Sequence, residues 1–95
     1  MTFDELTVAT IAQSVSSALR FAAQADSVKA QSALERAEQL CARFTAGRPS
    51  HQRAVRVARE LVTGARSAVT ASTSRERSRY TRATVRAVAR LDSRP

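Results

Sequence analysis

The sequence predicts an all-α fold, a small antiparallel bundle of four helices in a single domain that spans residues 1–95. Apolar side chains recur every three or four residues along most of the chain, which is the period of amphipathic helices. The composition favours helices too, since the chain holds 19 Ala but two Gly and two Pro. Capping residues and one strong break divide the pattern into four segments.

The length and composition predict a thin core. Apolar residues make up 43% of the chain, yet many of them are Ala, whose side chain buries little surface. Trp is absent, and Tyr80 and three Phe are the aromatic residues. A core of this kind in a small domain requires closely packed helices, and we expect a second copy of the chain to complete it.

The first predicted helix begins at Thr2, where "TFDE" fits a capping box in which Glu5 reaches back to Thr2. Its apolar stripe consists of Val8, Ile11, Ala12, Val15, Ala18, Leu19 and Ala22. Another side carries Phe3, Leu6 and Phe21 among mostly uncharged polar residues. Solvated helix faces normally carry more charge, so we expect these three residues to form a homodimer interface. The alternative is that a neighbouring helix of the same chain covers them.

A second helix is expected from Asp26 or Ser27 to the break at "AGRPS". Its stripe consists of Ala30, Ala33, Leu34, Ala37, Leu40, Cys41 and Phe44. Gly47 is expected just after this helix and Pro49 in the first turn of the next. The third helix is expected over about residues 50–71. Its stripe consists of Ala54, Val57, Ala58, Leu61, Val62, Ala65, Ala68 and Val69.

A fourth helix follows "TASTS", where Thr73 and Glu76 repeat the capping-box spacing. The residues that we expect it to bury are Tyr80, Ala83, Thr84, Ala87, Val88 and Leu91. The joints near Asp26 and Ser72 contain neither Gly nor Pro, and the apolar period continues through both. The alternative is therefore one long helical hairpin that turns at Gly47–Pro49.

Basic residues are concentrated in the C-terminal half of the chain. Residues 1–47 carry four basic and five acidic side chains, a balance of −1, whereas residues 48–95 carry twelve Arg and three acidic side chains, a balance of +9. GC-rich coding explains why Arg outnumbers Lys fifteen to one, but it does not explain this segregation. The asymmetry indicates a polyanionic or acidic partner.

Five arginines of the fourth helix fall on one line, because they follow one another at intervals of four, three, four and four residues. They are Arg75, Arg79, Arg82, Arg86 and Arg90. The third helix adds a second basic side, formed by Arg53, Arg56, Arg59 and Arg66. Solvated helix faces usually mix both signs of charge, so we interpret these residues as a binding site.

We expect a small non-enzymatic binding protein, with an accessory or regulatory role, whose arginines contact the backbone of nucleic acid. Base stacking is disfavoured by the few aromatic residues, and no three-residue turn precedes residues 82–91 at the distance that a helix-turn-helix requires. The alternative is an adaptor or inhibitor that docks its basic or uncharged helical face on a larger acidic protein, because guanidinium groups also bind carboxylates.

Neither catalysis nor a metal, cofactor or small-molecule site is expected. His51, the single histidine, falls in an exposed first turn, and Cys41 falls on an apolar stripe. Zinc-ligand spacings, phosphate-binding glycine loops and nucleophile elbows are absent from the sequence. No apolar run approaches the roughly 20 residues that span a bilayer, and the N-terminus lacks the features of a signal peptide. We therefore expect a cytoplasmic protein that does not contact membranes.

Overall fold

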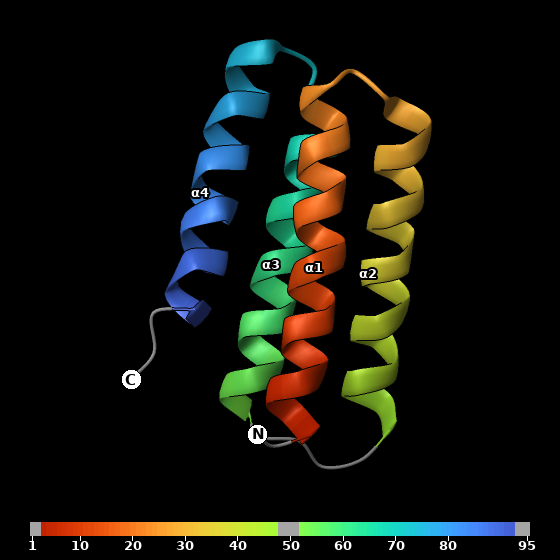
Figure 1. The fold of residues 1–95 in the computed structure, drawn as a ribbon, viewed down its shortest axis with the longest axis vertical. Coiled ribbons are helices and arrows are strands. Elements are labelled where there is room, and N and C mark those ends of the chain that lie inside the picture. The colour runs from red at the N-terminus through yellow and green to blue at the C-terminus, as the bar shows by residue number, and fades with distance from the viewer. Residues whose placement is uncertain (1–2, 48–51, 93–95) are drawn as a thin grey trace.

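The structure is a computed structural model that describes residues 3–47 and 52–92. The helices in this part of the chain are α1 (Phe3–Ala23), α2 (Ser27–Gly47), α3 (Gln52–Thr70) and α4 (Ser74–Asp92). Helices α1, α2 and α3 pack together as a group, and α4 lies against α3 at one edge (Figure 1). The predicted all-α bundle of four helices is confirmed. The alternative of one long hairpin is wrong, because the chain breaks after Ala23 and again after Thr70.

A Schellman motif ends α1. The N–H of Asp26 donates to the carbonyl oxygen of Phe21 at 2.9 Å, and the N–H of Ala25 donates to that of Ala22 at 3.1 Å. Ala25 takes the left-handed conformation that this motif requires, with a φ of 60°. Asp26 then caps α2, since its Oδ1 accepts a hydrogen bond from the N–H of Lys29 at 3.1 Å. These contacts explain how the chain turns without Gly or Pro.

Replacing Ala25 with glycine is expected to stabilise the fold by about 0.5–1 kcal/mol, because glycine adopts a positive φ without steric strain. The gain is smaller than the strain released, since glycine also makes the unfolded chain more flexible. Urea denaturation should show a higher midpoint with an unchanged slope. Ala23→Gly, at the end of α1, is the control and should lower the midpoint instead. A lower midpoint for Ala25→Gly would contradict the left-handed conformation.

A side-chain cap also begins α4. The Oγ1 of Thr73 accepts a hydrogen bond from the N–H of Glu76 at 3.1 Å, and the carbonyl oxygen of Thr73 accepts one from the N–H of Arg77 at 3.0 Å. A threonine cap of this kind satisfies an N–H group that the first helical turn leaves unpaired. The predicted break between helices near Ser72 is therefore explained by the Thr73 cap, although the sequence there contains neither Gly nor Pro.

The predicted central break lies between the described ends of α2 and α3. Helix α2 includes Gly47, so the prediction that this glycine lies just after the helix is wrong. The described part of α3 begins at Gln52, within the predicted range of about residues 50–71. Pro49 and His51 lie outside the described residues, and so does the predicted capping residue Thr2.

The main core forms between α1, α2 and α3. Every residue of the predicted α1 stripe is buried, and the predicted stripes of α2 and α3 are buried or half-buried. The largest fully buried side chains are Ile11, Val15, Leu34 and Leu61. Helices α1 and α3 each contact all three other helices and therefore form the centre of the packing.

Helix α4 packs mainly on α3 and buries less of its surface. Thr84 is 4% exposed, while the half-buried residues of the predicted stripe are Tyr80, Ala87 and Val88. The prediction that Ala83 is buried is wrong, because the strip that contacts α3 is centred near Thr84 and adjacent helical positions are rotated by about 100°. The side chain of Leu91 lies outside the described part of the structure.

Gly64 allows α3 and α4 to approach closely. A Cβ atom at this position would collide with the Oγ1 of Thr84 and would lie 3.3 Å from its Cβ and Cγ2 atoms. The Thr84 hydroxyl is held in place, since it donates to the carbonyl oxygen of Tyr80 at 2.8 Å. The absence of a side chain at Gly64 therefore sets the separation of the two arginine-bearing helices.

Candidate functional site

Helix α4 carries its predicted arginine row on the side that faces away from the bundle. Arg82 and Arg86 each lie two residues from the buried Thr84, and helical positions two apart point to nearly opposite sides. The exposed members of the row are Arg75, Arg79, Arg82, Arg86 and Arg90. The row therefore follows an outer edge of the molecule.

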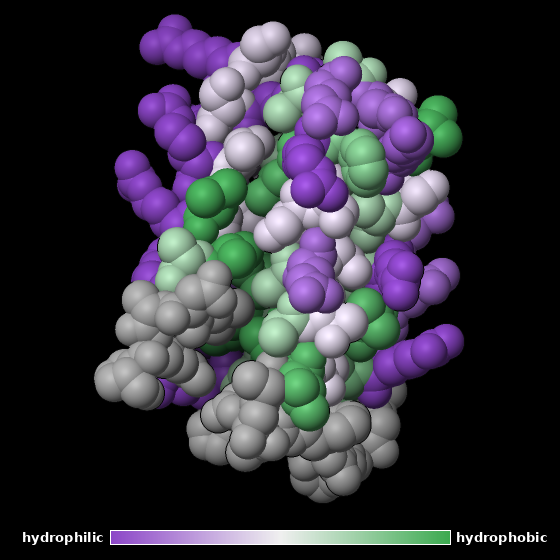
Figure 2. Space-filling model, in the orientation of Figure 1, coloured by the Kyte–Doolittle hydropathy of each residue, from purple (hydrophilic) through white to green (hydrophobic). Residues whose placement is uncertain are grey.

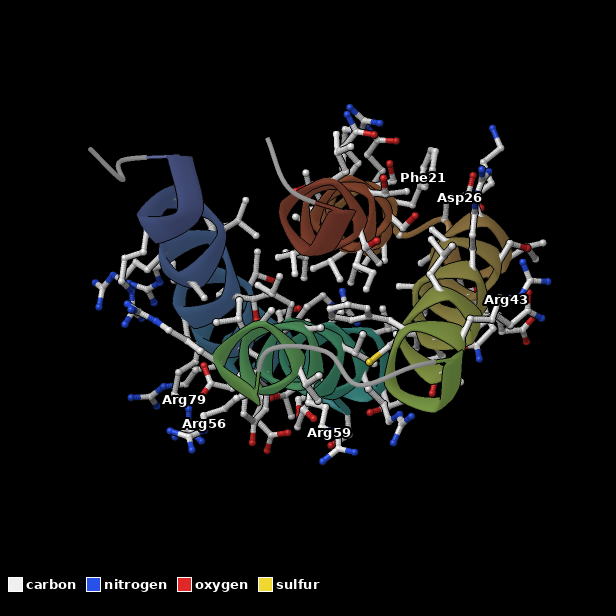
Figure 3. All side chains as sticks on the ribbon, turned by 90° about the horizontal axis from the view of Figure 1, so that it is seen from below. Phe21, Asp26, Arg43, Arg56, Arg59 and Arg79 are labelled. Carbon is white, nitrogen blue, oxygen red and sulfur yellow. The ribbon has the colours of Figure 1, made fainter. Side chains whose placement is uncertain are left out.

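Two arginines of α3 lie on the same side of the molecule as one arginine of this row. Arg56 and Arg59 project from the side of α3 that is opposite α1, and Arg79 of α4 lies on the same side (Figure 3). The exposed arginines of α3 are Arg53, Arg56, Arg59 and Arg66. We refer to the two sets together as the arginine face, which consists of Arg53, Arg56, Arg59, Arg66, Arg75, Arg79, Arg82, Arg86 and Arg90.

Few carboxylates neutralise the arginine face. Arg66 forms an ion pair with Glu38 of α2, which ties this arginine to the neighbouring helix. Among the described residues, no carboxylate lies within ion-pair distance of Arg79, Arg82 or Arg86. Most of the positive charge on α4 is therefore open to solvent and to a ligand.

A shallow groove lies over α3 beside α4, within the arginine face. The residues that line it are Val55, Arg56, Arg59, Glu60, Thr63, Gly64, Ser67 and Tyr80. Arg79 covers the half-buried ring of Tyr80, with its Cζ 5.1 Å from the ring centre and an N–H that donates to the phenol oxygen at 3.4 Å. Helices α3 and α4 contain one aromatic residue, Tyr80. Because Arg79 covers its ring, the arginine face presents no free ring on which a base can stack.

The side of α1 that we predicted as a dimer interface is partly covered by its own chain. Leu6 is 53% exposed, whereas Phe21 is half-buried. Arg20 and Lys29 each place a cation 5.6 Å from the centre of the Phe21 ring. Figure 2 shows pale and weakly hydrophobic side chains among hydrophilic ones over α1. The side chain of Phe3 lies outside the described part, and the dimer stays a prediction.

Cys41 lies in the core and is not arranged for reaction. Burial raises the pKa of its thiol, although the nearby Arg59 guanidinium acts in the opposite direction. The thiol is therefore protonated at neutral pH, and a protonated thiol is a weak nucleophile. No group of three or more His, Cys, Asp or Glu side chains converges within residues 3–47 and 52–92. None of the described helices combines the length and the apolar character needed to cross a membrane.

Three features of the arginine face were not predicted from the sequence: the close approach at Gly64, the cover over Tyr80 and the ion pair of Arg66. A glycine inside a helical pattern is a local signal of such an approach, whereas the other two depend on packing that no local pattern records. No protein-family model, curated protein or solved structure gives a significant match to the chain. The arginine face is therefore the feature from which a function can be inferred.

Proposed function

We propose that the protein binds the backbone of nucleic acid through the arginine face. The observation that carries this proposal is the two exposed sets of arginines on α3 and α4, of which Arg79, Arg82 and Arg86 have no ion-pair partner among the described residues. A guanidinium group presents paired N–H donors that match the oxygens of a phosphate. Arginines three or four positions apart on a helix are about 5–6 Å apart at their Cβ atoms, so one row can follow successive phosphates.

The arginine row destabilises the free protein. Three pairs in the row are separated by four residues and one by three, and like charges at these spacings cost about 0.2–0.5 kcal/mol each. The row therefore costs α4 about 1–2 kcal/mol at low ionic strength. A bound polyanion removes this repulsion and releases its own counterions, so binding should be strongest at low salt.

The test is the salt dependence of binding to a short duplex, measured by fluorescence anisotropy. The logarithm of the affinity should fall with the logarithm of the salt concentration, with a slope of about −0.9 per neutralised phosphate and about −3 to −5 for the row. A variant with Arg79→Gln, Arg82→Gln and Arg86→Gln should flatten this slope by about two to three units. Its fold should be retained, because the three side chains are exposed.

The matched control carries Arg20→Gln, Arg36→Gln and Arg43→Gln, which remove the same charge from exposed sites on α1 and α2. This variant should keep most of the slope. Equal losses in the two triple variants would mean that net charge, and not the arginine face, determines binding. No binding at low salt would contradict the proposal and would favour the alternative, an acidic protein partner. That alternative predicts the loss of one specific complex in the first triple variant.

A further inference from the structure

We propose that α4 enters the major groove of duplex DNA, with its outward arginine row directed at the groove and the arginines of α3 on the phosphates beside it. This inference rests on the proposed function and names its ligand. Helix α4 lies at the edge of the bundle and packs mainly on α3 (Figure 1), and the side of it that carries Arg75, Arg79, Arg82 and Arg86 is exposed. An α-helix with its side chains is about 10–12 Å wide, and the major groove of B-DNA is about 12 Å wide.

Small residues flank the arginine row and allow a close approach to the groove. Ser78, Ala83 and Ala89 are exposed on α4 and lie on the two flanks of the row. Arginine side chains can fold aside, whereas large rigid residues at these positions would hold the helix away from the bases. Val85 is 51% exposed, and a valine methyl group can contact the methyl group of thymine.

The outward row can contact base edges as well as phosphates. The two N–H donors of a guanidinium group match O6 and N7 of guanine in the major groove, which is the commonest specific contact of arginine with DNA. The row spans sixteen residues from Arg75 to Arg90, and the fifteen steps between them correspond to about 22 Å of helix. That length corresponds to about six base pairs at the 3.4 Å rise of DNA. Arg56 and Arg59 lie to one side of the row and would contact the phosphates that border the groove.

Two related ligands fit this surface less well. The major groove of duplex RNA is deep and narrow, so a helix cannot enter it. Single strands are usually bound by stacking their bases on aromatic rings, and the ring of Tyr80 is already covered by Arg79. Duplex DNA therefore matches both the shape of α4 and the chemistry of the arginine face.

The experiment compares three probes of one mixed sequence: duplex DNA, duplex RNA and single-stranded DNA. The 95-residue chain should bind duplex DNA about tenfold more tightly than the other two probes, which corresponds to one bidentate arginine–guanine contact. Dimethyl sulfate methylates N7 of guanine in the major groove, and bound protein should protect these atoms. Equal or tighter binding to duplex RNA or single strands, or unprotected N7 atoms, would overturn this inference and leave backbone binding intact. No binding to any probe at low salt would instead contradict the proposed function itself.

A steric variant tests the insertion without changing charge. Ala83→Leu with Ala89→Leu places bulk beside the row at exposed positions and keeps good helix-forming residues. Its affinity for duplex DNA should fall by about tenfold, the value of one lost base contact. Ser32→Leu with Gln39→Leu adds two leucines to exposed positions of α2 and should leave affinity unchanged. Unchanged affinity in the α4 variant, with circular dichroism that shows an intact fold, would also overturn the proposal.

Discussion

Replacing Gly64 with alanine is expected to destabilise the bundle by about 1–2 kcal/mol and to weaken binding at the arginine face. The new Cβ atom would collide with the Oγ1 of Thr84, whose side chain is buried and whose hydroxyl is bonded to the carbonyl oxygen of Tyr80. Helix α4 must therefore shift away from α3, and overpacking of this kind typically costs about 1–3 kcal/mol. The higher helix propensity of alanine offsets up to about 1 kcal/mol of this cost, so the net loss in the free energy of unfolding is smaller.

A double-mutant cycle isolates this contact. Thr84→Ala removes the Oγ1 and Cγ2 atoms that the new Cβ would meet, so adding it to Gly64→Ala should restore much of the lost stability. Urea denaturation of the wild type, the two single variants and the double variant gives the coupling free energy. If the two losses simply add, this contact does not set the distance between α3 and α4.

Leu61→Ala is expected to lower the free energy of unfolding by more, about 3 kcal/mol. This loss lies within the usual cost of truncating a buried leucine. Leu61 is fully buried on α3, which contacts all three other helices. The surrounding core is rich in alanine, so few large side chains can move to fill the cavity. Because small domains are stable by about 5–15 kcal/mol, this loss should be visible as a large decrease in the midpoint of thermal or urea denaturation.

The control for Leu61 is the same substitution at an exposed leucine. Leu6 is 53% exposed on α1, and Leu6→Ala should cost less than about 1 kcal/mol. The two variants lose identical atoms, so the difference between them measures burial. Similar losses at the two positions would contradict the placement of Leu61 at the centre of the core.

The helices and their buried stripes could be predicted because they depend on local periodicity. In α1 the three-and-four spacing identified Ile11 and Val15, which are fully buried. The same pattern failed at Ala83, since small apolar residues at a stripe's margin do not reveal which flank a neighbouring helix covers. The turn after α1 was placed near Asp26 from its capping chemistry, but the left-handed Ala25 could not be predicted, because alanine is not favoured in that conformation.

The residues of the arginine face could also be predicted from local helical spacing, but the way the two helices place them together could not. Helical spacing alone identifies the row on α4, and the structure exposes its five residues. The placement of Arg56 and Arg59 beside that row depends on how α3 and α4 pack, which no sequence period encodes. The pairing of Arg66 with Glu38 joins residues 28 positions apart and likewise required the tertiary arrangement.

Because α4 lies at the edge of the bundle, we expect it to separate from the other helices before the rest of the domain unfolds. Elements with few buried contacts unfold locally at a lower free energy than the rest of a domain, and they lose their amide protection first. Opening of α4 would carry the arginine row away from α3 while α1, α2 and α3 remain packed. A ligand that binds only the closed arrangement stabilises it according to its concentration relative to Kd. Occupancy of the arginine face would therefore be recorded as slower hydrogen exchange in α4, with much smaller changes in α1.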